Sequence, residues 1–320
     1  MSRLYVSGSR RASMTSRPSF GVAIASQPLV SVIMNCYNGE KYLRQAIESV
    51  FAQTYTNWEI IFWDNNSTDK SAEIVRSFDS RRVKYFHDSN HKLLYDARNH
   101  AIEKASGDFI AFLDVDDWWL PTKLEKQIPL FSDPEVGLVC GIYWLDDERK
   151  NKRRRSHKRP IPTGWVLNDV LKSYFVGMPT LVVRRSALAS LDHPCDPRYN
   201  MIGDFDLVVR LLIGWKLDCV QEPIACYRVH DNNESAKKLR RHIEEMEQWY
   251  SEMATVEPIH SCSNFPFIES HFLYLEAKDQ IVHADRMGAY RLLNRLPWGL
   301  RKLRIWIALF APPFVLRRLT

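Results

Sequence analysis

The stretch Phe109-Ile110-Ala111-Phe112-Leu113-Asp114-Val115-Asp116-Asp117-Trp118 joins an apolar run directly to three carboxylates. A hydrophobic run this continuous is typical of a buried strand in a parallel sheet. The carboxylates would then emerge at the carboxyl end of the strand, the edge at which open α/β sheets bind ligands. Carboxylates gathered there favour a hard divalent cation, Mg²⁺ or Mn²⁺. Taken alone, the stretch also fits an acidic turn that caps a helix starting near Pro121.

The chain before this stretch alternates between strand and helix patterns. Strands are expected where β-branched and aromatic residues gather, and helices where apolar residues recur every three or four positions. This alternation predicts an α/β fold with a Rossmann-like, mostly parallel central sheet and helices on both faces. The expected strands are 29–34, 58–63, 83–86 and 109–113, and the expected helices are 43–51, 69–78 and 96–105.

The second half of the chain is less regular. Its strands are expected at 137–144, 176–184 and 218–227, and a helix at 206–213. From there the pattern becomes helical, and the chain ends in a basic and apolar segment. We divide it into a disordered basic tail (1–27), an α/β domain (28–235), a helical extension (236–296) and a terminal tail (297–320).

Two basic segments each allow two interpretations. Residues 146–158 are hydrophilic and rich in Arg and Lys, which favours a solvated hairpin over a patch for anionic lipid head groups or an anionic acceptor. In the terminal tail, basic residues flank the twelve apolar residues Ile305–Leu316. That run is shorter than the roughly 20 residues that cross a bilayer, and Pro312-Pro313 interrupts it. The tail either lies in a membrane interface or packs back onto the domain.

The composition excludes some classes of partner. Lys and Arg number 44 against 38 Asp and Glu, and this net charge of +6 is too small and too local for a nucleic-acid interface. The six cysteines form no CxxC pair, which indicates reduced thiols and a cytoplasmic protein. Residues 1–20 lack the apolar core of a secretory signal.

Polar residues also follow the first two strands. Asn35 and Tyr37 end the first strand, where Tyr37 is placed to stack on a base. Asp64 ends the second strand and is placed to hydrogen-bond a base or a ribose. Arg98, on the helix before the acidic stretch, either contacts the same ligand or lies on a solvated helix face.

The acidic stretch is expected to act on a phosphate leaving group. A divalent ion held by one or two carboxylates neutralises the charge that grows on such a group. We predict Asp116 as the main metal ligand with Asp117 assisting, and Asp114 nearer the ribose. Arg228 and His230 alternate along a later strand and therefore share a face, from which they reach the phosphates or the metal.

Asp204 and Asp206 precede an apolar helix. Two residues apart, they cannot both lie on its buried face, so one is expected to cap the helix and the other to face the cleft. We nominate Asp204 as a general base that deprotonates an acceptor hydroxyl. A purely capping role for Asp204 is the alternative.

With these residues in place, residues 28 to 235 resemble the family-2 glycosyltransferases of the GT-A fold. The resemblance implies inverting transfer of one sugar from a nucleotide-diphosphate sugar, with UDP favoured, to a hydroxyl of a glycan or lipid-linked glycan. It also implies base contact by Asp64, ribose and metal binding by the acidic stretch, Asp204 as the base, and Tyr227, Arg228 and His230 near the phosphates. It rests on the segments 31–38, 53–60, 64–69, 97–99 and 107–117.

Three departures qualify the resemblance. Gly203 stands where an acid commonly precedes the base, and His100 where Gly is common. The Gln-x-x-Arg-Trp segment and multi-span domain of processive synthases are not found, which favours transfer of one sugar at a time. Gly203 keeps a non-catalytic nucleotide-binding protein as a rival. A nucleotidyltransferase is less favoured, because Tyr37-Asn38-Gly39-Glu40 replaces the Gly-rich basic loop that it needs.

Overall fold

The computed structural model describes residues 27–233 and 238–310. The expected basic tail, apart from residue 27, and the last ten residues of the terminal tail lie outside the described residues. The strands are β1 (Val30–Cys36), β2 (Trp58–Asp64), β3 (Val83–His87), β4 (Phe109–Phe112), β5 (Trp118–Trp119), β6 (Val136–Asp147), β7 (Lys152–Arg155), β8 (Val182–Arg184) and β9 (Lys216–Val229).

Helices follow most of these strands. The 3₁₀ helices are η1 (Ile128–Ser132) and η2 (Met178–Thr180). The α-helices are α1 (Leu43–Phe51), α2 (Ser71–Arg76), α3 (Leu94–Glu103), α4 (Lys123–Gln127), α5 (Leu167–Lys172), α6 (Arg185–Leu188), α7 (Gly203–Leu212), α9 (Leu239–Met253), α10 (Pro266–Val282), α11 (Arg286–Arg295) and α12 (Leu300–Phe310).

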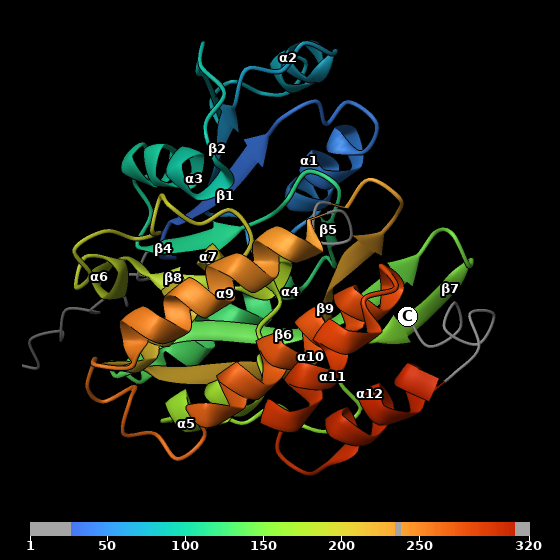
Figure 1. Cartoon of the computed structure of the whole chain (residues 1–320). Coiled ribbons are helices and arrows are strands. Elements are labelled where there is room, and N and C mark those ends of the chain that lie inside the picture. The colour runs from blue at the N-terminus through green and yellow to red at the C-terminus, as the bar shows by residue number, and fades with distance from the viewer. Residues whose placement is uncertain (1–26, 234–237, 311–320) are drawn as a thin grey trace, which may run out of the picture.

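One curled sheet runs through the molecule in the order β3-β2-β1-β4-β8-β6-β9-β5, with β7 paired to β6 (Figure 1). The first four strands are parallel to one another, and so are β6 and β9. β8 is antiparallel to both β4 and β6, and thus joins the two parallel groups. The predicted mostly parallel α/β fold is confirmed.

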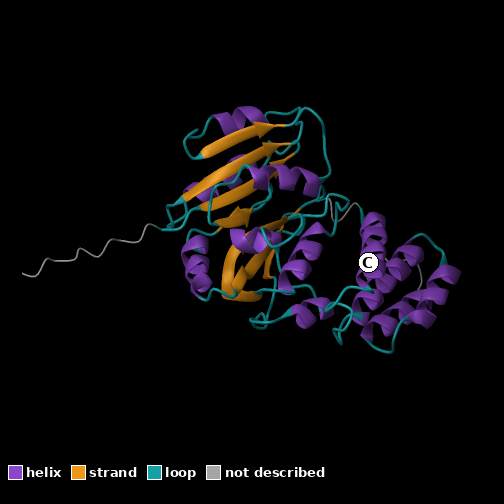
Figure 2. Ribbon diagram, turned by 90° about the vertical axis from the view of Figure 1, so that its left-hand side faces the viewer, coloured by secondary structure: helices purple, strands orange, loops and turns teal. Residues whose placement is uncertain are grey.

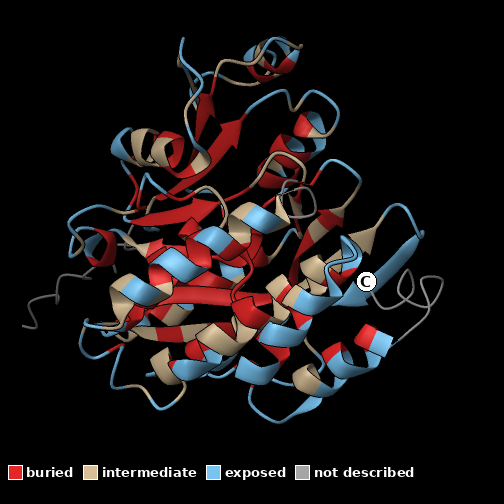
Figure 3. Ribbon diagram, viewed as in Figure 1, coloured by how far each residue is buried: buried red, intermediate tan, exposed pale blue. Residues whose placement is uncertain are grey.

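Both faces of the sheet are buried, which explains the continuous apolar runs. Along β1, Val30, Val32 and Met34 pack with α1, whereas Ile33 points to the other face and packs in the cluster that contains α3. Most of the strands are accordingly buried in Figure 3, whereas β7, the outer helix faces and many loops are exposed. The carboxyl ends of β1, β2 and β4 meet at one edge, where the polar residues gather.

The structure bears on two expectations about the second half of the chain. Of the strand expected at 176–184, the structure forms only the three residues of β8, preceded by η2. Pro179 has no N–H for a strand ladder, which accounts for the turn. The basic segment 146–158 forms the β6–β7 hairpin, and all four residues of β7 are exposed, as the hairpin interpretation expects.

The expected helical C-terminal region is present as α9 to α12, beside the sheet (Figure 2). α12 packs against α10 and α11 through Ile305, Ala308 and Leu309. Within residues 27–233 and 238–310, none of the helices has the length and apolar character needed to cross a membrane.

Candidate active site

A cavity of about 840 Å³ opens at the carboxyl ends of β1 and β4. Asn35 and Tyr37 reach it from β1, Asp114 and Asp116 from the loop after β4, and Arg98 from α3. Its other walls come from segments distant in sequence, so the fold brings together most of the residues predicted for the site. These further lining residues include Tyr143, Tyr174, Asp204, Tyr227, His230 and Arg241.

Asn35 is the clearest sign of a ligand in this cavity. Its side chain is buried, with 9% of its surface exposed, and neither Oδ1 nor Nδ2 has a hydrogen-bond partner among the described residues. A buried amide without partners costs about 1–3 kcal/mol per unsatisfied group. Both atoms are shielded from solvent here, so a polar ligand in the cavity would satisfy them only after a small movement of neighbouring side chains.

Asp114 forms an ion pair with Arg98, whose side chain is buried. Arg98 lines the cavity and therefore does not lie on a solvated helix face. Burial is the largest single effect on Arg98 and lowers its pKa, but Asp114 and the other nearby acidic groups together raise the pKa overall. The pair fixes one carboxylate of the acidic stretch against α3.

Asp116 faces His230, with 3.1 Å between Oδ2 and Nε2. Asn233 Nδ2 lies 3.5 Å from the same oxygen. Burial, followed by the nearby Asp114, raises the pKa of Asp116. A cation would relieve this unfavourable carboxylate. No group of three or more His, Cys, Asp or Glu suited to a metal is found within the described part of the chain, so Asp116 and His230 would need phosphate oxygens to complete a coordination shell.

The side chain of Asp117 lies apart from that of Asp116 in this structure, and its assistance in metal binding stays a prediction. It is buried outside the cavity lining, and its Oδ1 accepts the backbone N–H of Arg228 at 2.8 Å. Burial raises its pKa, with Asp116 and Asp114 adding to the effect. Asp117 therefore ties the acidic loop to β9.

Arg228 is also placed differently from the prediction. Its Nε donates to the carbonyl of Asp116 at 2.8 Å, and its other nitrogens donate to Glu148 and Gln45. The guanidinium lies between the Tyr42 and Trp118 rings, 4.2 and 4.5 Å from their centroids. Arg228 does not line the cavity. It holds the backbone that carries Asp116, and direct phosphate contact by Arg228 stays a prediction.

Replacing Arg228 by Lys should therefore lower the free energy of unfolding by about 1.5–3 kcal/mol, because an ammonium cannot keep the three-way fork of charged hydrogen bonds. Urea denaturation would measure this loss. The matched control is Arg153→Lys on β7, half exposed beside Asp146, where less than about 1 kcal/mol is expected. A raised KM for donor with unchanged stability would instead indicate phosphate binding by Arg228.

Asp64 and Tyr37, both predicted to contact the nucleotide, differ in their position relative to the cavity. Asp64 is buried behind the cavity, where it accepts the Ser67 N–H at 2.8 Å and the Tyr85 hydroxyl at 2.7 Å. Tyr37 lines the cavity, is 54% exposed, and lies 4.2 Å from the His91 ring between centroids. Tyr37 is thus accessible to a base, whereas a base contact by Asp64 requires access to a carboxylate that is only 1% exposed.

The two acids of α7 point to different places, as expected, but neither caps the helix. Asp204 lines the cavity, where its Oδ1 accepts the Phe205 N–H at 2.8 Å and its Oδ2 lies 3.4 Å from the Tyr174 hydroxyl. Asp206 is buried with Arg210 and accepts the indole N–H of Trp249 at 3.0 Å. The prediction that one acid caps the helix is wrong.

The setting of Asp204 suits a base. Burial raises its pKa above the ordinary value, while the Phe205 N–H, Arg98 and the Tyr95 hydroxyl act in the opposite direction. A raised pKa makes a carboxylate a stronger proton acceptor near neutral pH.

Tyr95 explains why Gly stands at position 203. A Cβ atom on Gly203 would lie 2.4 Å from the Tyr95 ring, a distance that requires the ring to move. Tyr95 is buried and occupies the space that an acidic side chain would need. The sequence alone does not predict this contact, because no local pattern links residue 95 to residue 203.

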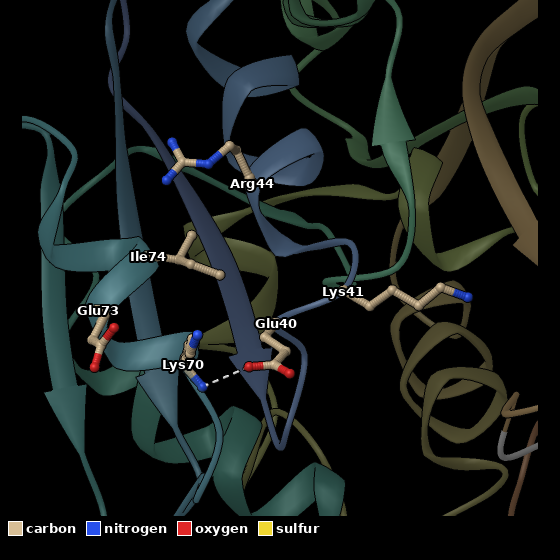
Figure 4. A pocket seen from close by; sticks show the side chains of 6 residues that line it. All are labelled: Glu40, Lys41, Arg44, Lys70, Glu73 and Ile74. Atoms are coloured by element: carbon tan, nitrogen blue, oxygen red, sulfur yellow. Dashed lines mark hydrogen bonds between the residues drawn. The ribbon is translucent and has the colours of Figure 1, made fainter.

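Tyr174, Asn233 and Arg241 are further lining residues that sequence reasoning missed. They come from irregular loops or from the start of α9, and they carry no motif by which they could have been found. A second, more open hollow lies against α1 and α2, where Glu40 accepts the Lys70 N–H at 2.9 Å (Figure 4). Its mixed charges include no carboxylate of the acidic stretch.

Comparisons with known proteins agree with this geometry. The sequence profile described as "Glycosyl transferase family 2" matches residues 31–190. The chain belongs to this family. It is therefore a glycosyltransferase, and the expected resemblance is confirmed.

Among curated relatives of this glycosyltransferase is the Escherichia coli "UDP-Glc:alpha-D-GlcNAc-diphosphoundecaprenol beta-1,3-glucosyltransferase WfgD". It is 32% identical over 214 residues, which cover 66% of this chain and 81% of the relative. The "putative teichuronic acid biosynthesis glycosyltransferase TuaG" of Bacillus subtilis is 30% identical, covering 66% and 83% of the two chains.

Solved structures show the same GT-A fold. S. aureus TarS superposes with a TM-score of 0.61 at 18% identity, covering 87% of this glycosyltransferase and 52% of that chain. A mannosyltransferase of Pyrobaculum calidifontis, solved with GDP-Man and Mn²⁺, gives a TM-score of 0.61 at 16% identity, covering 88% and 79%.

Proposed function

We propose that this glycosyltransferase transfers one sugar from a nucleotide-diphosphate sugar to a hydroxyl of a lipid-linked glycan, with inversion at the anomeric carbon. The observation that carries the proposal is that Asp204 lines the same cavity as Asp114, Asp116 and the unpartnered Asn35 amide. A base for the acceptor and an acidic site for the diphosphate thus share one space.

Asp204 accepts the proton of the acceptor hydroxyl as the hydroxyl oxygen bonds to the anomeric carbon. The bond from that carbon to the diphosphate breaks, and its electron pair leaves with the phosphate oxygen. Attack from the face opposite the leaving group inverts the anomeric carbon. Arg98 holds Asp114 in place on the donor side of the cavity.

A divalent cation fits the donor set of Asp116 and His230. Both side chains face each other in the cavity, and Mg²⁺ and Mn²⁺ are commonly held by one or two protein ligands together with phosphates. When bound, such an ion neutralises charge on the leaving diphosphate. The Mn²⁺ of the Pyrobaculum neighbour supports this assignment.

The names of relatives support the choice of substrates. WfgD and a second Escherichia coli enzyme, WfaP, are named as using UDP-Glc and GlcNAc-diphosphoundecaprenol. We therefore favour a UDP-sugar donor, a diphospholipid-linked glycan acceptor and a role in the synthesis of a surface polysaccharide. Such an acceptor would place the enzyme at the cytoplasmic face of the membrane.

Release of nucleoside diphosphate from a panel of nucleotide sugars tests the proposal. We expect Mn²⁺-dependent release from one donor, and a decrease of at least about a hundredfold in Asp116→Ala, because the charge on the leaving group is then uncompensated. Asp133→Ala, on an exposed turn beside Lys216, is the matched control and should retain release.

Three outcomes would count against the proposal. Equal release with and without metal would contradict the proposed role of a divalent cation. Two negative results together would contradict the proposal that the cavity binds a nucleotide sugar. These are release from no donor and a melting temperature that no nucleotide changes. Nucleotide binding without turnover, even with acceptor, would favour the non-catalytic rival.

A further inference from the structure

Large apolar side chains are exposed along one side of α12. Trp298, just before the helix, is 90% exposed, and Phe310 at its end is 69% exposed. Clustered apolar side chains on a surface mark an interaction site. We define the α12 stripe as these two residues together with Leu300, Leu303, Trp306 and Ile307, which are 46–74% exposed.

α12 thus has two apolar faces. Ile305, Ala308 and Leu309 are buried against the rest of the helical region. Leu300, Leu303, Ile307 and Phe310 recur at intervals of three and four residues, which places them along a single line of the helix, away from the buried face. The helix therefore packs onto the domain and still presents an apolar surface.

Basic residues border the α12 stripe. Helical spacing places Arg304 along one edge of the stripe and Lys302 along the other. Lys302 Nζ lies 4.9 Å from the centroid of the Trp298 ring. The segment from Arg286 to Phe310 contains six basic residues and no acidic one. Aromatic and aliphatic side chains flanked by cations suit the boundary between lipid head groups and acyl chains.

The positive charge around the α12 stripe also distinguishes between possible binding partners. A symmetric contact with a second copy would bring the same basic residues against one another. None of the helices in the described ranges is suited to span a bilayer. We infer that the α12 stripe docks this glycosyltransferase onto the surface of an anionic lipid bilayer. That this contact presents a lipid-linked acceptor to the cavity rests on the proposed function.

Cosedimentation of the full chain with vesicles tests the inference. Vesicles of phosphatidylcholine with 30% phosphatidylglycerol, a composition we choose for the assay, should bind the protein at least about tenfold more tightly than phosphatidylcholine alone, since each basic residue at the surface adds attraction. This binding should weaken as salt screens the charges. The variant Leu303→Ser/Trp306→Ser/Ile307→Ser should lose at least about tenfold of it.

Two controls locate the contact. Trp165→Ser removes an aromatic side chain that is 58% exposed before α5 and should leave vesicle binding unchanged. Arg153→Glu/Arg154→Glu reverses charge on the exposed β7 and should cost less than the stripe variant. Full binding by the stripe variant, or a larger loss in the β7 variant, would overturn the inference.

Light scattering tests whether the α12 stripe instead binds a second copy of this chain. A wild-type dimer that the stripe variant converts to a monomer would overturn the lipid assignment. The stripe variant should also keep nucleoside diphosphate release from a soluble donor, because its substitutions are exposed and outside the cavity. Vesicle binding without any such release would contradict the proposed function and leave this inference standing.

Discussion

Replacing Asp204 by Asn should lower the rate of sugar transfer by about a hundred- to ten-thousandfold, the usual contribution of a general base. The amide has the size of the carboxylate and can still accept the Phe205 N–H, but it cannot take a proton from the acceptor. Steady-state transfer with a saturating donor would measure the loss. The thermal shift produced by nucleotide and metal should stay as in the wild type.

The pH dependence of sugar transfer by the wild-type enzyme should also reflect the role of Asp204 as a base. Asp204 must be ionised to accept a proton, so activity falls as pH falls through its pKa. Burial raises that pKa, with Asp114 acting in the same direction and Arg98 and Tyr95 against it. The loss should therefore occur at a higher pH than for an exposed Asp, and the residual activity of Asp204→Asn should lack it.

Asp206→Asn is the matched control, two residues along the same helix. Asp206 is paired with Arg210 and bonded to Trp249, so this change should lower stability and leave the acid limb of the pH profile in place. Transfer at the wild-type rate by Asp204→Asn would exclude Asp204 as the base.

The strand-end positions of the candidate site could be predicted because they follow from the fold. A buried strand that runs into Asp114 and Asp116 fixes where those carboxylates emerge, and the first strand does the same for Asn35 and Tyr37. The cavity contains all four. Parallel strands share one carboxyl edge, so the order of elements alone brings these residues together.

The direction of individual side chains could not be predicted in this way. Asp117 follows Asp116 directly but turns inward to accept the Arg228 N–H. Arg228 itself depends on Gln45 and Glu148, which are distant in sequence. Which polar groups satisfy one another is settled by packing between loops, and periodicity contains no information about it.

Replacing Gly203 by Glu, which would supply the acid commonly found before the base, should lower the free energy of unfolding by about 4 kcal/mol or more. The new Cβ would lie 2.4 Å from the Tyr95 ring. Overpacking alone costs about 1–3 kcal/mol, and the added carboxylate would be buried beside the like charge of Asp204. Denaturant unfolding would measure the loss. Gly214→Glu is the control, since nothing lies within 4 Å of its Cβ position.

A second substitution distinguishes steric conflict from intolerance of any acid. If Tyr95 occupies the space, the stability loss in Tyr95→Ala/Gly203→Glu should be clearly smaller than the sum of the losses in the two single variants, because the truncated ring makes room for the new side chain. The rate of sugar transfer then tests how replacing the Tyr95 ring by an acid at position 203 affects Asp204. The rate of sugar transfer could fall in Tyr95→Ala and return in the double variant. That result would show that either Tyr95 or an acid at position 203 can position Asp204. A double variant whose loss equals the sum of the two single losses would show that the buried charge, and not the ring, excludes an acid from position 203.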